Sequence, residues 1–295
     1  MELKVTVDFR DRVVVVTGGA RGMGRAYVRA FLSNGAKVVA TDKSWNGVDE
    51  FKAELQAQDR NVLMAEMDVT DNVQIDQTYK ATLDKFGTVD VLINNAAMRQ
   101  RDLFPPAGRT TTLQTKDSDW ERLFGVNVFG VLKVIRRFIQ PMIEKRKGSI
   151  ISVVSSGVIH HSHGGAYVAL RPNSREMPYM SSKAALATLS FYLADEVKEH
   201  NVAVNVIIPG HTRTTGFDEQ NRARMAAGST RRGPQPMMPE HIVPLVQYLA
   251  SQDTSGITGK MFDTMQWNIE HGLGGHETWE DKSFSYDALL VNQDR

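Results

Sequence analysis

Short runs of apolar, mostly β-branched residues recur along the chain and are separated by longer stretches with helical spacing. Four consecutive valines at 13–16 begin the series. Runs without polar alternation are typical of strands that are buried on both faces of a parallel sheet. The expected strands are 13–16, 37–41, 61–67, 89–93, 148–156, 202–208 and 257–263.

Apolar residues at helical spacing lie between most of these runs. One helix is expected to begin at Asp71 and to end before Gly87, since an acidic cap and a closing glycine flank it. This alternation of elements predicts an α/β fold, a doubly wound parallel sheet (Rossmann fold) of about seven strands with helices on both faces. The other expected helices follow the turn at 17–24 as far as Gly35 and cover 48–58, 118–143, 179–200 and 241–251.

The chain of 295 residues is expected to form one domain over 1–295, with a C-terminal tail at 264–295. Three segments, 98–117, 157–178 and 212–239, lack periodicity and are predicted to be loops. The last of them is polar, rich in arginine and interrupted by glycine and proline, which is typical of a flexible lid.

Composition excludes several classes of protein. Lys and Arg number 35 against 34 Asp and Glu, so no strong field favours nucleic acid or an anionic membrane. The chain has no cysteine, which rules out disulfides, thiolate nucleophiles and cysteine-bound metals. The N-terminal segment does not resemble a secretory signal, and the apolar runs are too short to span a bilayer. We expect a cytoplasmic protein.

The first strand leads into the sequence TGGARGMG at 17–24, and a helix follows it. A strand, a glycine-rich turn and a helix form an arrangement that cradles a pyrophosphate, because the free N–H groups of the helix face the anion. Gly18 permits the tight turn, Gly22 lets the backbone approach the phosphates, and Gly24 permits close packing of helix on strand. The spacing G-x-x-x-G-x-G differs from the commoner G-x-G-x-x-G, and a glycine-rich turn without a ligand is the alternative.

The second strand ends at Asp42. A carboxylate at this position can accept hydrogen bonds from both ribose hydroxyls of an adenosine and repels a 2′-phosphate. Arg21 and Lys43 have the opposite effect, since either can meet a 2′-phosphate. We expect NAD rather than NADP. A simple turn residue is the alternative reading of Asp42.

Tyr179 and Lys183 lie four residues apart at the start of a helical segment, so both side chains are expected on one helix face. A tyrosine titrates near 10, which is too high for a general base at neutral pH, and a fixed positive charge nearby favours the phenolate. This spacing alone is weak evidence, because it is common in helices.

Together, the order of these features resembles the short-chain dehydrogenase/reductase family, in the branch with the motifs TGxxxGxG and YxxxK. The resemblance extends from about residue 12 to 263. It rests on TGGARGMG (17–24), Asp42, Asp68-Val69, NNAA (94–97), Asn127 within a helix, the serines after the fifth strand, YMSSK (179–183) and PGHTRT (209–214).

The resemblance implies roles for individual residues. Tyr179 would exchange a proton with the substrate oxygen, and Lys183 would bind the nicotinamide ribose and lower the pKa of the phenol. Asn127 would hold a water that links Lys183 to solvent. Ser155 would orient the substrate oxygen. Counting from Asn127 or Gly148 favours Ser155, whereas counting from Pro141 gives Ser156, and only one can face the substrate.

The resemblance also implies a cofactor site and an assembly. Asp68 and Val69 would contact the adenine, Asn95 the adenosine side, and Thr212 or Thr214 the nicotinamide amide. Relatives of this kind are commonly homo-oligomers, as tetramers or dimers. The expected cofactor-binding residues are Gly18, Arg21, Gly22, Met23, Gly24, Asp42, Asp68, Val69, Asn95, Tyr179, Lys183, Pro209, Gly210, Thr212 and Thr214.

The chain departs from the family pattern in segments expected on the substrate side. Residues 157–178 are about ten residues longer than is usual there, and 264–295 replace a glycine-rich ending. The tail would pack on a neighbouring subunit or over a site, or would be a loose surface extension. Histidines in the insertion (His160, His161, His163) are not expected to bind a metal, and with Tyr167 they are candidates for substrate contact. Arginines of the lid would form a solvated face or a clamp for a carboxylate or phosphate: Arg213, Arg222, Arg224, Arg231 and Arg232.

The sequence therefore predicts an NAD(H)-dependent oxidoreductase that interconverts a secondary alcohol and a ketone, with Tyr179 as the acid/base. The partner is a small molecule, and neither nucleic acid nor membrane. Two alternatives remain: a catalytically idle dinucleotide-binding sensor or scaffold, and an epimerase or dehydratase that uses the same site.

Overall fold

The computed structural model describes residues 7–104, 111–158, 177–226, 228, 230 and 232–291. Seven strands form one sheet in the order β3-β2-β1-β4-β5-β6-β7, and every neighbouring pair is parallel. The doubly wound sheet predicted from the apolar runs is confirmed. The strands are β1 Val13–Thr17, β2 Lys37–Asp42, β3 Val62–Glu66, β4 Val91–Asn94, β5 Gly148–Val153, β6 Val202–Ile208 and β7 Met261–Asp263.

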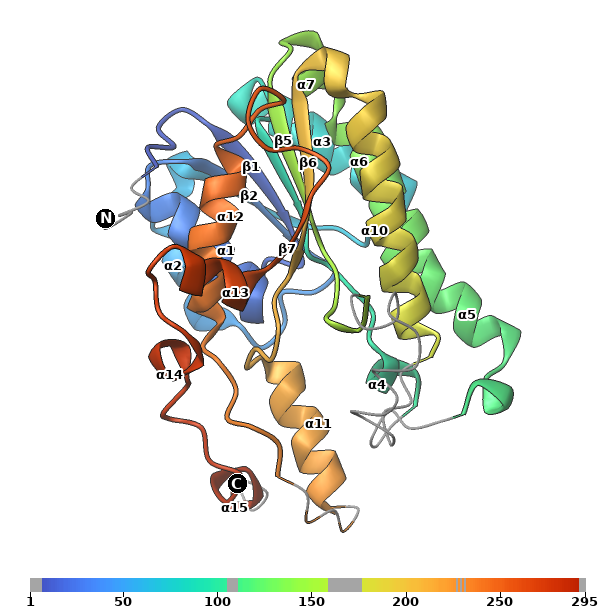
Figure 1. Ribbon diagram of the computed structural model, residues 1–295. Helices are drawn as coiled ribbons and strands as arrows, with labels where there is room; N and C mark the ends of the chain where they lie inside the picture. The colour runs from blue at the N-terminus through green and yellow to red at the C-terminus, as the bar shows by residue number, and fades with distance from the viewer. Residues whose placement is uncertain are drawn as a thin grey trace.

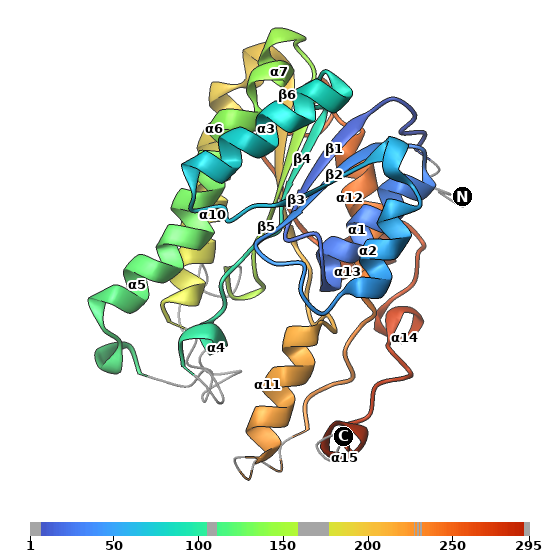
Figure 2. The ribbon, with the colours of Figure 1, turned by 180° about the vertical axis from the view of Figure 1, so that it is seen from behind.

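Helices cover both faces of the sheet (Figures 1 and 2). On one face the helices α1 Gly22–Ser33, α2 Asp49–Gln56 and α12 Val243–Ala250 pack on a core that includes Val14 and Val16. On the other face, α3 Asn72–Phe86, α6 Val131–Phe138 and α10 Tyr179–Glu196 pack on a core that includes Val13 and Val15. The four valines alternate between two buried faces, which explains why the run has no polar position.

The strand order reverses between β1 and β4, where the chain leaves one edge of the sheet and continues on the other side of β1. In open α/β sheets, ligands bind outside the carboxyl ends of the strands at such a switch point. Parallel register puts Thr17 opposite Thr41 and Asn94 opposite Ser152. The segments that follow β1, β2, β4, β5 and β6 therefore meet at one edge.

Local signals in the sequence explain where helix α3 begins and ends. The Asp71 carboxylate accepts hydrogen bonds from the amides of Val73 (2.8 Å) and Gln74 (3.3 Å) and so caps α3. Gly87 ends this helix with φ +76°, a left-handed conformation that suits glycine. Both ends of α3 agree with the prediction.

The helix expected over 118–143 is divided. It consists of α5 Asp117–Phe124, the π-helical turn η3 Gly125–Gly130, α6 Val131–Phe138 and α7 Gln140–Glu144. A β-carbon on Gly130 would lie 2.8 Å from the Val69 side chain, so glycine is needed where η3 meets the turn after β3. The wide turn buries Asn127 completely. Such π-helical turns are frequent at functional sites.

Two of the three segments predicted as loops contain helices, and most of the third, 157–178, lies outside the described residues. A lid without regular structure was expected over 212–239, but α11 Thr215–Ala226 lies within it. Its apolar residues do not follow one stripe, because it packs on no face of the sheet and instead extends below the body of the molecule (Figures 1 and 2). The segment 98–117 contains α4 Gln100–Leu103 and the 3₁₀ turn η2 Thr112–Gln114. Further 3₁₀ turns are η1 Asp59–Asn61, η4 Lys198–His200 and η5 Pro239–Ile242.

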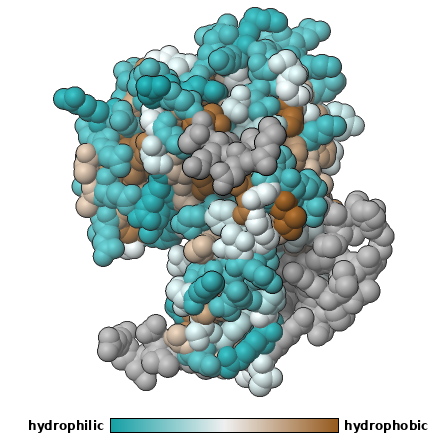
Figure 3. Space-filling view, turned by 60° about the vertical axis from the view of Figure 1, so that its left-hand side comes forward, coloured by the Kyte–Doolittle hydropathy of each residue, from teal (hydrophilic) through white to brown (hydrophobic). Residues whose placement is uncertain are grey.

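The C-terminal tail is folded onto its own chain. It comprises α13 Thr264–Glu270, α14 His276–Trp279 and α15 Ala288–Val291. The Met238 amide donates to the Trp279 carbonyl (2.8 Å), and the Asp281 amide donates to the Pro236 carbonyl (2.8 Å). The view in Figure 3 shows a mostly hydrophilic surface with small hydrophobic patches on this side of the molecule. Residues 264–291 are therefore not a loose surface extension.

None of the helices in the described ranges is long and apolar enough to cross a lipid bilayer. Likewise, no group of three or more His, Asp or Glu side chains within those ranges is placed to hold a metal ion. The candidates His160, His161, His163 and Tyr167 lie outside the described residues, as does Arg231.

Candidate active site

A cleft of about 1030 Å³ lies at the carboxyl edge of the sheet. It is lined by the glycine-rich turn, by the ends of β2, β4, β5 and β6, by the start of α10 and by parts of α4 and α11. Of the residues expected in the site, only Gly24 and Asn127 do not line it. The expected residues that do are Gly18, Arg21, Gly22, Met23, Asp42, Asp68, Val69, Asn95, Ser155, Tyr179, Lys183, Pro209, Gly210, Thr212 and Thr214.

The glycine-rich turn has the backbone of a phosphate cradle. Gly18 and Gly22 have φ values of +67° and +51°, which other residues adopt only with strain. A β-carbon on Gly24 would lie 1.9 Å from the Gly18 carbonyl oxygen, so no side chain fits there. Thr214 lies against Gly22 from the far side, since its Cγ2 is 3.0 Å from where a β-carbon would stand. These residues fit a dinucleotide pyrophosphate at the start of α1.

The Asp42 carboxylate stands beside this turn. It accepts a hydrogen bond from the Ala20 amide (3.1 Å) and one from the Ser44 amide (3.3 Å). Arg21 does not pair with Asp42; its guanidinium donates to the carbonyls of Ser44 (3.1 Å) and Asn46. Arg21 is therefore held by the main chain after β2, while the carboxylate lines the cleft.

Asn95 fastens the glycine-rich turn to β4. Its side-chain amide donates to the carbonyls of Thr17 (2.9 Å) and Gly18 (3.1 Å). The Thr17 hydroxyl accepts from the backbone amides of Asn95 and Ala96, each at 3.1 Å. These bonds make Asn95 a support of the cradle as well as part of the cleft wall. Next to β3, Asp68 is held by its own turn, since its carboxylate accepts from the Thr70 amide (2.8 Å).

Lys183 is buried at the base of the cleft. Its side-chain ammonium donates to the Val153 carbonyl (2.8 Å), and only 2% of the residue is exposed. Burial lowers the pKa of Lys183 to about 8 because the charged form loses its hydration. The ammonium lies 5.9 Å from the centre of the Tyr179 ring. The two side chains therefore reach the same part of the cleft, as their spacing on a helix predicts.

Asn127 lies behind this pair rather than in the cleft. Its amide group donates to the Ser182 hydroxyl (2.9 Å) and to the Met98 carbonyl (2.9 Å), and its carbonyl accepts from the Met98 amide (2.8 Å). Ser182 in turn donates to the Tyr179 carbonyl (2.7 Å). Both amide hydrogens of Asn127 are thus used within the protein, so a water can approach this side chain only as a hydrogen-bond donor.

The residues after β5 and β6 complete the base of the cleft. Ser155 and Ser156 both line it and are half-buried, so the preference for Ser155 stays a prediction. After β6, Gly210 has φ +74°, and the Thr212 hydroxyl donates to the Pro209 carbonyl (3.2 Å).

His241 supports this last turn and was not expected from the sequence. The ring is fully buried, with Nε2 2.6 Å from the Pro209 carbonyl and Nδ1 2.7 Å from the Met238 carbonyl. Burial lowers the pKa of His241, against the effect of these two carbonyls. A neutral ring donates to only one of them. No sequence signal marks this residue, because a histidine at the start of a helix is ordinary.

Two of the five arginines considered as an anion clamp, Arg213 and Arg232, form ion pairs within the protein. Arg213 forms ion pairs with Asp218 (3.1 Å) and Asp281 (2.9 Å). Burial opposes the charge of Arg213, but hydrogen bonds to these two carboxylates outweigh it and raise its pKa. Arg232 pairs with Asp287 (2.6 Å) at the surface. Sequence reasoning did not foresee these partners, because two of the three carboxylates belong to the tail.

Sequence reasoning also missed two arginines of the 98–104 segment that line the cleft. Arg101 is almost buried and contacts Asp102 and Glu219, each at 3.5 Å, so it links α4 to α11 across the cleft. Burial lowers the pKa of Arg101, and neighbouring Arg99 adds to that effect. A β-carbon on Gly216 would collide with both guanidinium groups. A side chain at this position of α11 would displace the ends of these two arginine side chains.

The fold and the cleft define a dinucleotide-binding α/β enzyme whose cleft also contains a tyrosine and a buried lysine. A family model described as short chain dehydrogenase matches residues 12–225. The chain belongs to the short-chain dehydrogenase family, whose members are oxidoreductases that use nicotinamide cofactors. The resemblance inferred from the motifs is thereby confirmed.

Relatives and a solved structure agree with this assignment. The chain is 48% identical over 276 residues to a fluoren-9-ol dehydrogenase from Terrabacter sp. (strain DBF63), covering 94% of this chain and 77% of that protein. It is 30% identical over 258 residues to a meso-2,3-butanediol dehydrogenase from Serratia marcescens, covering 85% and 92%. The crystal structure of a levodione reductase superposes with a TM-score of 0.70 at 26% identity, covering 86% and 96%.

Proposed function

We propose that the protein is an NAD(H)-dependent dehydrogenase that interconverts a secondary alcohol and a ketone, with Tyr179 as the acid/base. The observation that carries this proposal is the placement of Tyr179 and Lys183 in one cleft with the glycine-rich turn and Asp42. The names of two relatives support the substrate class, since fluoren-9-ol and meso-2,3-butanediol are both secondary alcohols.

A bound nicotinamide would supply the hydride chemistry, in which the alcohol carbon loses a hydride or the ketone carbon gains one. The residues of this chain handle the proton. Tyr179 removes the hydroxyl proton as the carbonyl forms, and returns it in the reverse direction. With a pKa of about 8, Lys183 is mostly protonated at pH 7, so its ammonium favours the phenolate of Tyr179. Ser155 orients the substrate oxygen.

Asn127 acts on this site through position. Its hydrogen bonds hold the first turn of α10, through Ser182, against the segment that follows β4. That contact fixes the backbone from which the Tyr179 side chain extends, because Ser182 bonds to the Tyr179 carbonyl. The wide turn of η3 brings Asn127 into this buried position.

The preference for NAD rests on Asp42 and Arg21. A 2′-phosphate at the adenosine end would approach the Asp42 carboxylate, and like charges repel. The Arg21 guanidinium is occupied by two main-chain carbonyls and so contributes less to binding a phosphate. The same carboxylate can accept hydrogen bonds from the ribose hydroxyls of NAD.

The test is the appearance of NADH when the purified protein is mixed with NAD and a panel of secondary alcohols. Tyr179→Phe should lower kcat by about 10²–10⁴-fold and leave NAD binding unchanged, since it removes only the proton-transferring group. If NAD binds but the protein neither oxidises an alcohol nor reduces a ketone, then it is a dinucleotide sensor or scaffold. If a substrate is converted without net change in NADH, it is an epimerase or dehydratase.

A homo-oligomer and a cytoplasmic location remain predictions. Large apolar side chains exposed on η3 and α10 support contact with a second copy: Phe129, Phe191 and Tyr192. The elution volume in size-exclusion chromatography distinguishes a monomer from a dimer or tetramer.

A further inference from the structure

Four aromatic rings form a continuous row that begins at the turn after β6 and ends in the C-terminal tail. His211 contacts Phe217 edge to face at 4.9 Å between ring centres, Phe217 contacts Phe284 at 5.4 Å, and Phe284 contacts Tyr286 at 4.9 Å. His211, Phe217 and Tyr286 line the cleft that also contains Tyr179. The row therefore leads away from the turn of Pro209 and Gly210, along one wall.

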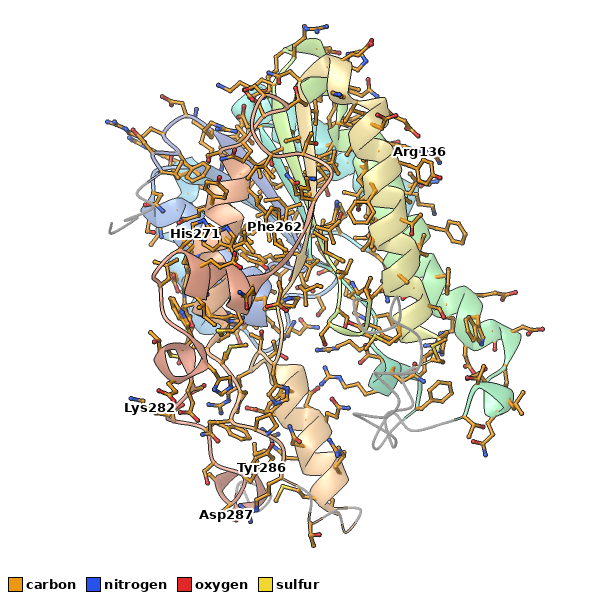
Figure 4. The ribbon with its side chains drawn as sticks, in the orientation of Figure 1. Arg136, Phe262, His271, Lys282, Tyr286 and Asp287 are labelled. Carbon is orange, nitrogen blue, oxygen red and sulfur yellow. The ribbon has the colours of Figure 1, made fainter. Side chains whose placement is uncertain are left out.

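The tail holds its part of this row in a fixed place beside α11, where Figure 4 labels Tyr286. The Tyr286 hydroxyl accepts a hydrogen bond from the Gly233 amide (2.9 Å), and the Phe284 carbonyl accepts one from the Gln235 side chain (2.7 Å). Phe284 and Tyr286 are 4% and 7% exposed. The Tyr286 hydroxyl keeps its own proton to donate, and its ring is the last of the row on the cleft wall.

Two arginines near the row are paired with carboxylates of the protein. Arg213 lies over the Phe284 ring at 5.3 Å and is bonded to Asp218 and Asp281. Arg101, at the opposite side of α11, contacts Asp102 and Glu219. This wall therefore favours an apolar group of the substrate over a carboxylate or a phosphate.

We propose that the aromatic row receives the apolar, preferably aromatic, body of the secondary alcohol, and that Tyr286 of the tail determines specificity for it. This inference rests on the proposed function and adds the substrate class. Aromatic groups prefer edge-to-face or offset contact with other rings, which the row offers along its length. A small aliphatic alcohol would bind next to Tyr179 without reaching Tyr286.

The test compares two alcohols that differ in apolar bulk, fluoren-9-ol and meso-2,3-butanediol, in the wild type and three tail variants. Tyr286→Ala should lower kcat/KM for fluoren-9-ol by about tenfold or more, mainly through KM, because it removes a packing surface from a bound apolar group. Its kcat/KM for meso-2,3-butanediol and its KM for NAD should stay within about twofold. Tyr286→Phe keeps the ring and should lose less than about threefold.

Asp287→Asn is the matched control. Asp287 follows Tyr286 directly, but its carboxylate pairs with Arg232 at the surface and does not line the cleft. It should leave both alcohols unaffected. If Tyr286→Ala has lost its fold in circular dichroism, Tyr286→Leu takes its place, since leucine keeps the core filled and removes the ring.

An equal loss for both alcohols in Tyr286→Ala would overturn the inference, because the tail would then act as a general brace. Equal kcat/KM for both alcohols in the wild type would overturn it as well. Binding of fluoren-9-one to the NAD complex, followed by calorimetry, separates this inference from the proposed function. Suppose that no alcohol is oxidised, but that fluoren-9-one binds and Tyr286→Ala weakens this binding about tenfold. The role of the aromatic row in binding would then be supported, and the dehydrogenase proposal would fail.

Discussion

Replacing Lys183 by methionine should remove activity and yet make the free protein more stable. The ammonium is buried, and its pKa falls from 10.5 to about 8. At about 1.4 kcal/mol for each pKa unit, holding this charge inside the fold costs about 3 kcal/mol at pH 7. Methionine has a similar volume and no charge, so it avoids that cost.

Part of this gain in stability is offset by the loss of a hydrogen bond. The Val153 carbonyl accepts the hydrogen bond from Lys183 (2.8 Å) and would be left without this partner, at a cost of about 1–2 kcal/mol. We therefore expect Lys183→Met to unfold with a free energy about 1–2 kcal/mol higher than the wild type at pH 7. Each kcal/mol corresponds to about 2–4 °C in Tm for a chain of this size. The value of kcat should fall by about 10²–10⁴-fold.

The stability difference should depend on pH with a defined sign. The folded pKa of Lys183 is depressed, so the unfolded chain binds more protons between about pH 8 and 10.5. Wild-type stability should therefore rise with pH across that window relative to the variant, and the advantage of Lys183→Met should shrink. Urea unfolding curves of both proteins without cofactor at pH 7, 8.5 and 10 measure this. The exposed Lys198→Met is the control and should change stability by less than about 0.5 kcal/mol at each pH.

A variant that is less stable than the wild type at pH 7, with a difference that does not change with pH, would refute this reasoning. The Lys183 ammonium would then be well compensated in the fold, and its buried position would have no cost. Loss of activity alone would not distinguish the two accounts.

Three other substitutions test the cofactor site and its support. Asp42→Asn should raise kcat/KM for NADP about tenfold, because it removes a repulsion of about 1–2 kcal/mol after allowance for solvent, and steady-state rates with NAD and NADP measure it. Gly24→Ala should weaken NAD binding, measured by calorimetry, more than tenfold, since its β-carbon would lie 1.9 Å from the Gly18 carbonyl oxygen. Gly19→Ala is the control: its β-carbon would have no contact under 3.4 Å, so this variant should bind NAD normally. Asn127→Ala should lower the free energy of unfolding, measured by urea denaturation, by about 2–4 kcal/mol, because it leaves both backbone groups of Met98 unpaired. It should also reduce kcat more than KM. An unchanged kcat would contradict the positioning role of Asn127.

The central part of the fold was predictable because its signals are local. The valine run of β1, the cap and closing glycine of α3 and the glycine-rich turn each specify a conformation without reference to distant residues. The switch point then follows from the alternation of strands and helices, so the residues that follow the strands could be assigned to one cleft before any contact was known.

The remaining features depend on contacts between distant segments. Helix α11 has no apolar stripe, because Phe217 packs on Phe284 of the tail rather than on the sheet. Arg213 could be read as a substrate clamp until Asp281, 68 residues further on, was seen to pair with it. The π-helical turn of η3 was missed for a similar reason: Gly130 is required by Val69, which lies in a different element.

The tail contacts also set an order for assembly during synthesis. All strands of the sheet precede residue 264, so the cradle for the cofactor can fold as soon as β7 has emerged from the ribosome. The wall formed by Phe217 and Tyr286 cannot, since the bond between Gly233 and Tyr286 spans 53 residues and closes only after the tail has been made. A nascent chain should therefore acquire the ability to bind dinucleotide before it acquires a shaped pocket for the alcohol.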